Sequence, residues 1–443
     1  MDKFVTKATK RTAPDGASSE SSAKKAKGTS GAPLPALESC KWETYGSILY
    51  MRNFTAVPST DAVKVASFDL DGTIITTKSG KTFATNANDW KFWHESVPAK
   101  LRELAADNYS IVIFSNQSGL SKGKVKETEL KTKLNSIVVQ LGVPVRVFLL
   151  SADDHMRKPR VGAWEFMLSH CQLQVDLAQS FYCGDAAGRP KAAGKPKKDF
   201  SCGDYKFAVN IGVPFMTPEK LFLNSTLVEP SPRPSCSPYP RLQTLHTKET
   251  SFELDFDPRT LLAETKAILP EWQLAPTSSQ EVVLLIGSPG SGKSTLYKSY
   301  FSSYGRVNQD ALKTPAKCKA AAVEFLKEGK SIVIDNTNRD VKTRSEWIQL
   351  AEDHKVPIRA FYLDIPKPLV FHLNEFRKLQ KELHPDRSEA KPNVPDMVIH
   401  GFYKNMIVPT TEEGFASVVH LPFIPAPGLD AADKKLLASF LLG

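Results

Sequence analysis

Two carboxylates, Asp69 and Asp71, follow an apolar run in the stretch VKVASFDLDGTI, residues 63–74. Side chains two residues apart in a strand point to the same face, so we expect both carboxylates to lie together at a strand end. Like charges this close resist joint ionisation unless a cation compensates them. The pair therefore predicts metal-assisted phosphoryl transfer. A turn or helix cap, the alternative, would fit a single Asp followed by Gly72.

Three more polar residues, Ser115, Lys158 and Asp185, follow later predicted strands. Carboxyl ends of parallel strands meet along one edge of a sheet, so we expect these side chains beside the acidic pair. In such a set one carboxylate attacks phosphorus, a second moves the proton of the leaving group and then of water, and a third helps to hold Mg²⁺. The hydroxyl and the ammonium would bind the phosphoryl oxygens.

A phosphate-binding motif begins the second half of the chain. An apolar run, Val282–Ile286, leads into GSPGSGKS, which fits GxxxxGK[ST] between a strand and a helix. Backbone amides at the helix start would cradle the phosphates of a nucleoside triphosphate, Lys293 would neutralise them and Ser294 would bind Mg²⁺. The predicted nucleotide-binding residues are Gly287, Ser288, Pro289, Gly290, Ser291, Gly292, Lys293, Ser294 and Thr295.

Two aspartates near the phosphate-binding motif predict a phosphoryl acceptor. Asp310 follows a short strand at 306–308 and could deprotonate a hydroxyl aimed at the γ-phosphate. Asp335 ends an apolar strand beginning at 331, the Walker-B-like place, where it could bind Mg²⁺ through water or position the acceptor. A plain ATPase would not require the first of these residues.

A helix predicted over 366–380 carries His372, Asn374, Arg377 and Lys378 and could present charge to the transition state. Arg344 is a second candidate for that role. Either arginine could equally be a cation on a helix surface, and the sequence leaves this open.

The elements that position these residues alternate between strand and helix, which predicts an α/β fold of two domains, each a three-layer structure around a parallel sheet. Apolar runs and helical periodicity predict the elements. In the first domain we predict strands at 110–114, 145–150 and 181–184, and helices at 97–108, near 125–140 and around Trp164 and Phe166. In the second domain we predict strands at 282–286, 306–308 and 331–334.

Composition divides the chain into four parts, 1–41, 42–224, 225–280 and 281–443. The first is rich in Ser, Ala and Lys and is expected to be a disordered tail. Its clusters Lys10-Arg11 and Lys24–Lys27 fit a bipartite nuclear import signal, although a solvated basic tail without such a signal remains the alternative. The third part is a Pro- and Ser-rich linker with a connecting segment.

The chain of 443 residues is basic, with 58 Lys and Arg against 48 Asp and Glu, a net charge of +10. This favours a polyanionic partner such as nucleic acid. The six cysteines form no CxxC pair, as expected of reduced cysteines in an intracellular protein. No apolar run reaches the length of a membrane span and no secretory signal is present, so we expect a soluble protein, and a monomer.

The spacing between the acidic pair and Lys158 leaves room for little beyond the sheet connections, so we expect an open site without a large cap. An open site suits the end of a polymer better than a small metabolite. Lys78 and Lys81, followed by Trp90 and Trp93, would suit a single-stranded end, although tryptophans at such positions are more often core.

A second basic loop follows the third acid. It holds Arg189, Lys191, Lys195, Lys197 and Lys198, which could line a nucleic-acid backbone or simply be surface charge. Asp199 or Asp204 could support the metal site without binding the metal directly. For both residues a solvated surface role fits the sequence equally well.

The set DLDGT, Ser115, Lys158 and Asp185 resembles the haloacid dehalogenase superfamily of phosphatases over residues 63–215. This resemblance implies that Asp69 is the nucleophile, that Asp71 is the general acid and base, and that both hold Mg²⁺ with Asp185.

The whole chain from Trp42 resembles the eukaryotic polynucleotide kinase 3′-phosphatases through KSGKTFAT, FSNQSG, RKPRVGAWE, GDAAGRP, GSPGSGKST, DNTNRD and HLNEFR. The resemblance implies an enzyme of DNA strand-break repair in the nucleus. It would remove 3′-phosphates at single-stranded ends and phosphorylate 5′-hydroxyls at DNA ends and nicks with ATP and Mg²⁺, and would meet other repair proteins. Asp310 then corresponds to the general base of the kinase.

Two features depart from that family. A forkhead-associated domain, with which mammalian-type members begin, is not expected here, and Gln309 precedes Asp310 where the family often has Arg. An RNA end-healing enzyme with the same chemistry is the alternative, and a damage-binding scaffold with one inactive site is another. The second alternative does not explain why both sets of site residues are complete.

Overall fold

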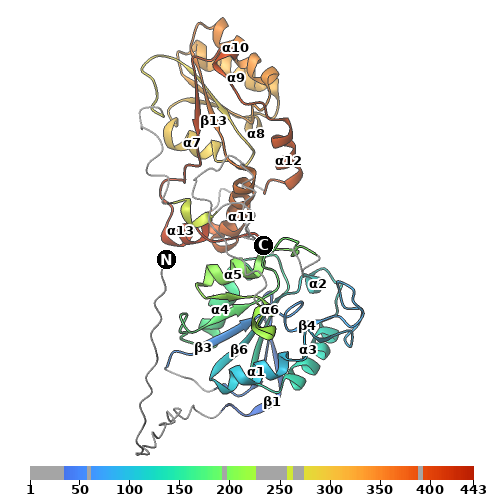
Figure 1. Cartoon of the computed structure of the whole chain (residues 1–443). Helices are drawn as coiled ribbons and strands as arrows, with labels where there is room; N and C mark the ends of the chain where they lie inside the picture. Colours follow the sequence, from blue (N-terminus) through green and yellow to red (C-terminus); the bar gives the residue numbers. More distant parts are fainter. Residues whose placement is uncertain (1–33, 57–60, 192–196, 226–256, 263–273, 388–392) are drawn as a thin grey trace, which may run out of the picture. The chain divides into compact units, whose positions relative to one another are not determined.

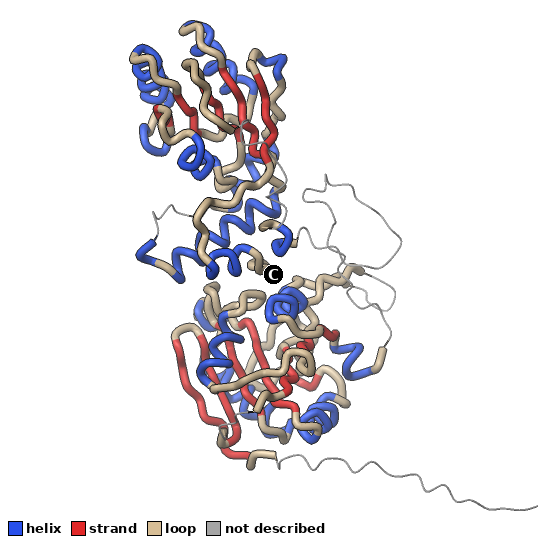
Figure 2. The backbone as a smooth tube through the Cα atoms, turned by 90° about the vertical axis from the view of Figure 1, so that its left-hand side faces the viewer, coloured by secondary structure: helices blue, strands red, loops and turns tan. Residues whose placement is uncertain are grey.

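The computed structural model describes residues 34–56, 61–191, 197–225, 257–262, 274–387 and 393–443. The predicted tail and its import signal lie almost entirely outside these residues, as does most of the predicted linker. The described part of the chain contains two large β-sheets, each flanked by helices (Figures 1 and 2).

The first sheet has seven strands in the order β1-β2-β7-β6-β3-β8-β9. Its five strands from β7 to β9 are parallel, as predicted. The strands are β1 (Leu37–Tyr45), β2 (Ile48–Phe54), β3 (Lys64–Phe68), β6 (Tyr109–Asn116), β7 (Val145–Leu150), β8 (Phe181–Cys183) and β9 (Phe215–Met216).

The hairpin of β1 and β2 is a difference from the prediction, because it extends this sheet antiparallel to β7. β1 begins at Leu37, within the stretch that the sequence assigns to the tail. Its sequence LESCKWETY is mostly polar and none of its residues is buried, as is usual for an edge strand. A strand of this kind lacks the apolar run by which the central strands could be predicted.

Helices cover both faces of the first sheet and make it a three-layer structure. Leu101, Leu134 and Phe222 lie in one apolar core, whereas Trp164 and Phe207 lie in the other. Burial on both faces explains why the central strands are nearly continuous apolar runs. The helices are α1 (Val97–Ala106), α2 (Ser118–Ser121), α3 (Glu127–Leu141), α4 (Gly162–His170), α5 (Gly203–Ile211) and α6 (Pro218–Leu223).

The connection between β3 and α1 contains a small hairpin, β4 (Ile75–Thr76) with β5 (Lys91–Phe92). This agrees with the expectation that no large cap covers the sheet edge. Trp90 is buried in the core and Trp93 packs against it, so the core alternative for these residues is confirmed. Lys78 and Lys81 are exposed.

The second sheet is five-stranded and parallel throughout, in the order β11-β12-β10-β13-β14. The sequence predicts its first three strands. β13 and β14 are additional to these predicted strands, although IRAFYL of β13 is an apolar run. The strands are β10 (Val282–Ile286), β11 (Gly305–Val307), β12 (Ile332–Asp335), β13 (Ile358–Leu363) and β14 (Ser417–Leu421).

Helices flank this sheet on both faces as well. Leu296 and Leu373 belong to the core on one face, and Leu326 and Trp347 to the core on the other. The α-helices are α7 (Lys293–Tyr300), α8 (Gln309–Leu312), α9 (Pro315–Lys327), α10 (Val341–Asp353), α11 (Lys367–Leu383), α12 (Asp396–Asn405) and α13 (Ala431–Leu437), and the short 3₁₀ turns are η1 (Pro258–Thr260), η4 (Pro385–Arg387) and η5 (Thr411–Glu413). Among the helices in the described part of the chain, none is long and apolar enough to cross a membrane.

Candidate active sites

The carboxyl edge of the first sheet brings four predicted residues into one site. Asp69 directly follows β3, Ser115 lies near the end of β6, Asp185 follows β8, and Lys158 precedes α4. The Lys158 Nζ donates to Asp69 Oδ1 at 2.7 Å. Adjacent parallel strands thus place side chains together that are far apart in the sequence, as the sequence predicts.

Asp204 completes this group and resolves one open alternative. It lies in the first turn of α5 and is buried, and its Oδ1 accepts from Lys158 Nζ at 2.7 Å and from the Tyr182 hydroxyl at 3.1 Å. Its Oδ2 accepts from the backbone N–H of Ala186 at 3.0 Å. Asp199 instead binds Arg189. Asp204 is therefore the acid that supports the site.

Lys158 is buried between two carboxylates. Burial alone would lower its pKa, but Asp204 and Asp69 outweigh that effect, and the pKa of Lys158 is raised. The ammonium also donates to the Tyr182 hydroxyl at 2.8 Å, a contact that the sequence analysis missed. The three acceptors match the three N–H donors of the ammonium, so Lys158 is fixed in place and charged, and a phosphoryl oxygen would take the place of one of these acceptors.

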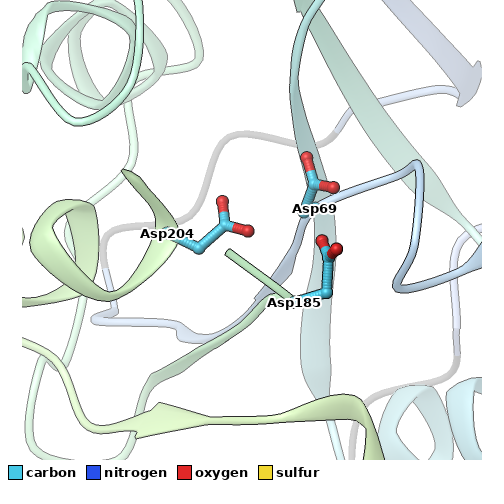
Figure 3. Close-up of side chains that lie close together, drawn as sticks. All are labelled: Asp69, Asp185 and Asp204. Carbon is cyan, nitrogen blue, oxygen red and sulfur yellow. The ribbon is translucent and has the colours of Figure 1, made fainter. Parts of the chain in front are cut away.

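The carboxylates of Asp69, Asp185 and Asp204 lie close together, with one oxygen of each within 4.8 Å of the others (Figure 3). Burial, with Asp204 and Asp185 as like charges, raises the pKa of Asp69 well above its usual range despite Lys158. Burial and Asp204 raise the pKa of Asp185 to about 7. A single ammonium thus leaves negative charge uncompensated. Because carboxylate oxygens are the donors that Mg²⁺ prefers, these residues fit a magnesium ion. Asp69 accepts from Lys158 through Oδ1, whereas both oxygens of Asp204 already accept hydrogen bonds, which favours Asp69 and Asp185 as the ligands.

The carboxylate of Asp71 lies outside this acidic group, and its role as a metal ligand stays a prediction. Its Oδ2 accepts from Gln117 Nε2 at 2.8 Å and its Oδ1 from Lys133 Nζ at 3.2 Å. The same Gln117 amide donates to Ser115 Oγ at 2.9 Å. Asp71 is therefore held beside the phosphoryl-binding serine with its side chain about half exposed, where it can exchange protons.

The basic loop after Asp185 differs in part from its prediction. Arg189 is buried and pairs with Asp199 and Glu219, so it anchors the loop and does not face a ligand. Lys191, Lys197 and Lys198 are exposed, whereas Lys195 lies outside the described residues.

The phosphate-binding motif lies between β10 and α7, as predicted. The Lys293 Nζ donates to the carbonyl oxygens of Gly287 and Ser288, both at 2.8 Å, so it lies inside the loop. Gly290 and Gly292 have positive φ angles of 87° and 102°, which the loop needs in order to turn its amides inward. These residues, with Pro289, Ser291, Ser294 and Thr295, fit a nucleoside triphosphate.

Ser294 and Asp335 lie together at the sheet edge, as expected of a Mg²⁺ site. The Ser294 hydroxyl donates to Asp335 Oδ2 at 2.9 Å. Arg306, which the sequence analysis missed, donates to the same oxygen at 2.5 Å and to Ser294 Oγ at 3.1 Å. Oxygen donors of these two types fit Mg²⁺ bound with nucleotide phosphates.

The predicted base, Asp310, is exposed in the short helix α8 at the same edge. Asn308 fixes the start of that helix, because its Nδ2 donates to the carbonyl of Asp335 at 2.5 Å and its Oδ1 accepts from Ala311 N at 3.2 Å. Asp310 is thus held near the end of β12 with its carboxylate accessible.

The two candidate arginines have different environments. The Arg377 guanidinium lies beside the phosphate-binding loop, since a Cβ at Gly290 would be 3.1 Å from its Nη2. Burial lowers its pKa, and its Nε is buried without a hydrogen-bond partner in the described structure. The orientation supports a role toward nucleotide phosphates.

Arg344 is wholly buried, and this points against the transition-state role predicted for it. Its Nε and Nη2 donate to Glu413 at 2.7 Å each, and its Nη1 donates to the carbonyl of Ile407 at 3.0 Å. The guanidinium is saturated by these partners and stabilises the fold. His372 is also buried, which lowers its pKa to about 4, and its ring contacts the carbonyl of Leu437, so it is neutral.

The two edges define the class of protein: a haloacid dehalogenase-like phosphatase and a P-loop kinase, both α/β, in one chain. Residues 64–222 match the family model described as polynucleotide kinase 3 phosphatase, and residues 282–395 match that of an AAA domain.

The curated relatives agree with both matches. The bifunctional polynucleotide phosphatase/kinase of Schizosaccharomyces pombe is 37% identical over 377 residues, 85% of this chain and 83% of its own length. A putative enzyme of that name from Acanthamoeba polyphaga mimivirus is 33% identical over 82% of this chain and 85% of its own length. The polynucleotide 3′-phosphatase of Saccharomyces cerevisiae is 31% identical over 36% of this chain and 87% of its own length. The chain belongs to the bifunctional polynucleotide phosphatase/kinase family, and it is a polynucleotide 3′-phosphatase and polynucleotide kinase.

Gly72 offers a test of the phosphatase geometry. Its φ is +88°, and a Cβ there would lie 2.5 Å from Asp185 Oδ2. Gly72→Ala is expected to displace that carboxylate and to lower the phosphatase rate by about 10²-fold, because small misplacements of reacting groups are this costly. Rates of 3′-phosphate release and of 5′ phosphorylation, measured on one preparation, check this.

Gly80→Ala is the matched control. Gly80 has a φ of +71° but no atom within 4 Å of the added Cβ, so it carries the backbone strain without the collision. If both variants lose the same phosphatase activity, backbone strain explains the loss. That result would contradict the inference that the added Cβ at position 72 displaces Asp185.

Proposed function

We propose that this enzyme repairs broken DNA ends in the nucleus. It removes 3′-phosphates through a phosphoryl intermediate on Asp69 and phosphorylates 5′-hydroxyls from ATP, so that the ends become substrates for joining. The observation that carries the proposal is the contact of Lys158 with Asp69 and Asp204 beside Asp185, in the same chain as the phosphate-binding loop around Lys293.

The phosphatase reaction proceeds in two steps. An Asp69 oxygen attacks phosphorus, the bond from phosphorus to the 3′ oxygen breaks, and that oxygen takes a proton from Asp71. Asp71, now a carboxylate, takes a proton from water as the water oxygen attacks phosphorus, which releases phosphate and restores Asp69. Lys158 and Ser115 hold the phosphoryl oxygens throughout. A magnesium ion held by Asp69 and Asp185 would offset the negative charge of this site.

The kinase reaction uses the edge of the second sheet. Lys293 and the loop amides bind the phosphates of ATP, and Ser294 and Asp335 would hold its Mg²⁺. Asp310 takes the proton of the 5′-hydroxyl as its oxygen attacks the γ-phosphorus, and ADP leaves. Arg377, beside Gly290, stabilises the charge on the transferred group.

Several features support a nucleic-acid end as the substrate. The phosphatase edge has no large cap in the described chain, and Lys78, Lys81, Lys191 and Lys197 are exposed on loops of that half of the chain. The net charge of +10 favours a polyanion, and the basic clusters at 10–11 and 24–27 support nuclear import. RNA ends are the alternative substrate with the same chemistry.

The substrate is decided by comparing reaction rates on a nicked DNA duplex and on the matched RNA duplex, with Mg²⁺ and ATP supplied. Each duplex carries a 3′-phosphate and a 5′-hydroxyl. We expect both reactions to be faster on DNA. Faster processing of RNA would contradict the repair proposal, and loss of only one activity on both substrates would favour a chain with one inactive site.

A further inference from the structure

Lys133 is a lysine that the phosphatase mechanism above does not use. It lies on the buried face of α3, together with Leu130, Leu134 and Ile137, and only 10% of its side chain is exposed. A lysine in such a position costs free energy unless its charge is paired. Its Nζ lies 3.2 Å from Asp71 Oδ1, on the carboxylate that exchanges protons.

The two oxygens of Asp71 are bound by different groups. Lys133 holds Oδ1, and Gln117 Nε2 contacts Oδ2 at 2.8 Å while also donating to Ser115 Oγ at 2.9 Å. Oδ2 therefore lies on the side of the phosphoryl-binding serine and Oδ1 lies toward α3. The rotation of the carboxylate about its Cβ–Cγ bond is fixed by a cation from one side and an amide from the other.

We propose that Lys133 is a positioning residue for the general acid: it holds Oδ1 of Asp71 so that Oδ2 delivers the proton to the leaving oxygen. This inference rests on the proposed role of Asp71. In the first step the bond from phosphorus to the 3′ oxygen breaks, and the Oδ2 proton passes to that oxygen while Lys133 stays protonated. Lys133 acts through Asp71, whose Oδ1 accepts from its ammonium.

The leaving group makes the proposal testable. A deoxyribose 3′ oxygen leaves as an alkoxide and needs a proton, whereas the nitrophenolate of p-nitrophenyl phosphate leaves without one. Loss of general-acid catalysis costs roughly 10²- to 10⁴-fold where the proton is needed. The rate of the first turnover, measured by rapid mixing, reports bond cleavage before the intermediate is hydrolysed.

Lys133→Met keeps the buried volume and removes the charge. We expect it to slow the first turnover of a 3′-phosphorylated oligonucleotide about 10- to 100-fold and that of p-nitrophenyl phosphate less than about threefold. Lys133→Arg is expected to recover most of the loss. Adding Lys133→Met to Asp71→Asn should cost nothing more, since the two residues act as a unit.

Lys131→Met is the control. Lys131 lies two residues away on the same helix and pairs with Glu127, and its described contacts do not include Asp71. Kinase activity and thermal unfolding of each variant exclude a folding defect. Equal slowing of both substrates by Lys133→Met, or no slowing, overturns the inference. If Asp71→Asn slows both substrates equally, the general-acid role of Asp71 is itself wrong. This result distinguishes failure of the proposed function of Asp71 from failure of the positioning role of Lys133.

Discussion

Replacing Asp69 by alanine abolishes release of 3′-phosphate and leaves 5′ phosphorylation intact. The side chain supplies the attacking oxygen and is bound by Lys158 Nζ at 2.7 Å, so its removal takes away both the nucleophile and one partner of the ammonium. We expect a loss of at least about 10⁴-fold in the phosphatase rate, in the range found when a covalent nucleophile is removed. Measuring both reactions on one nicked duplex checks this.

Folding is not expected to suffer from this change. Burial, together with Asp204 and Asp185 as neighbouring carboxylates, disfavours the charged form of Asp69 and raises its pKa, and removal of the side chain relieves that crowding. Lys158 keeps Asp204 as a partner. The thermal unfolding temperature should therefore be unchanged or higher. Glu103→Gln, an exposed carboxylate change on α1, is the control and should retain both activities. An active Asp69→Ala enzyme would rule out the aspartyl intermediate.

Apolar runs and the polar residues after them were enough to predict much of this architecture. Strands β7 and β10 agree with their predicted ranges, because strands of a parallel sheet are buried on both faces. Side chains at the ends of such strands share one edge, so topology brings the loop after β7, which carries Lys158, to the edge where Asp69 lies. The edge strand β1 could not be predicted in this way, since a half-exposed polar strand has no apolar run, whereas the buried residues of β2 do begin with one.

Residues outside the strand ends were harder to predict. Asp204 lies 46 positions after Lys158, and only the docking of α5 brings the two together. Arg344 shows a different limit, because the sequence reveals a cation but not its burial against Glu413. Lys133 did carry a signal: it is three residues after Leu130 and four before Ile137, on the apolar face of a helix. A lysine in that position needs a partner of opposite charge, which here is Asp71.

Replacing Lys293 by alanine has the reciprocal effect. Its ammonium lies within the phosphate-binding loop, 2.8 Å from the carbonyls of Gly287 and Ser288, where it would neutralise the transferred phosphate. Removing a preorganised charge of this kind costs roughly 10²- to 10³-fold or more, so 5′ phosphorylation should fall by at least that factor while 3′-phosphate release is unchanged. ATP consumption and labelling of the 5′ end measure the kinase reaction, and release of phosphate measures the phosphatase reaction.

Lys298→Met provides the matched control for that change, since Lys298 is an exposed lysine on the same helix, α7, one turn beyond the loop. It should keep both activities. Lys293→Arg tests charge against shape: because the loop encloses a narrow ammonium site with both carbonyls at hydrogen-bond distance, the bulkier guanidinium should restore little kinase activity. Full kinase activity in Lys293→Ala would contradict the assignment of this loop as the ATP site, whereas loss of both activities with a lowered unfolding temperature would show that the lysine stabilises the fold.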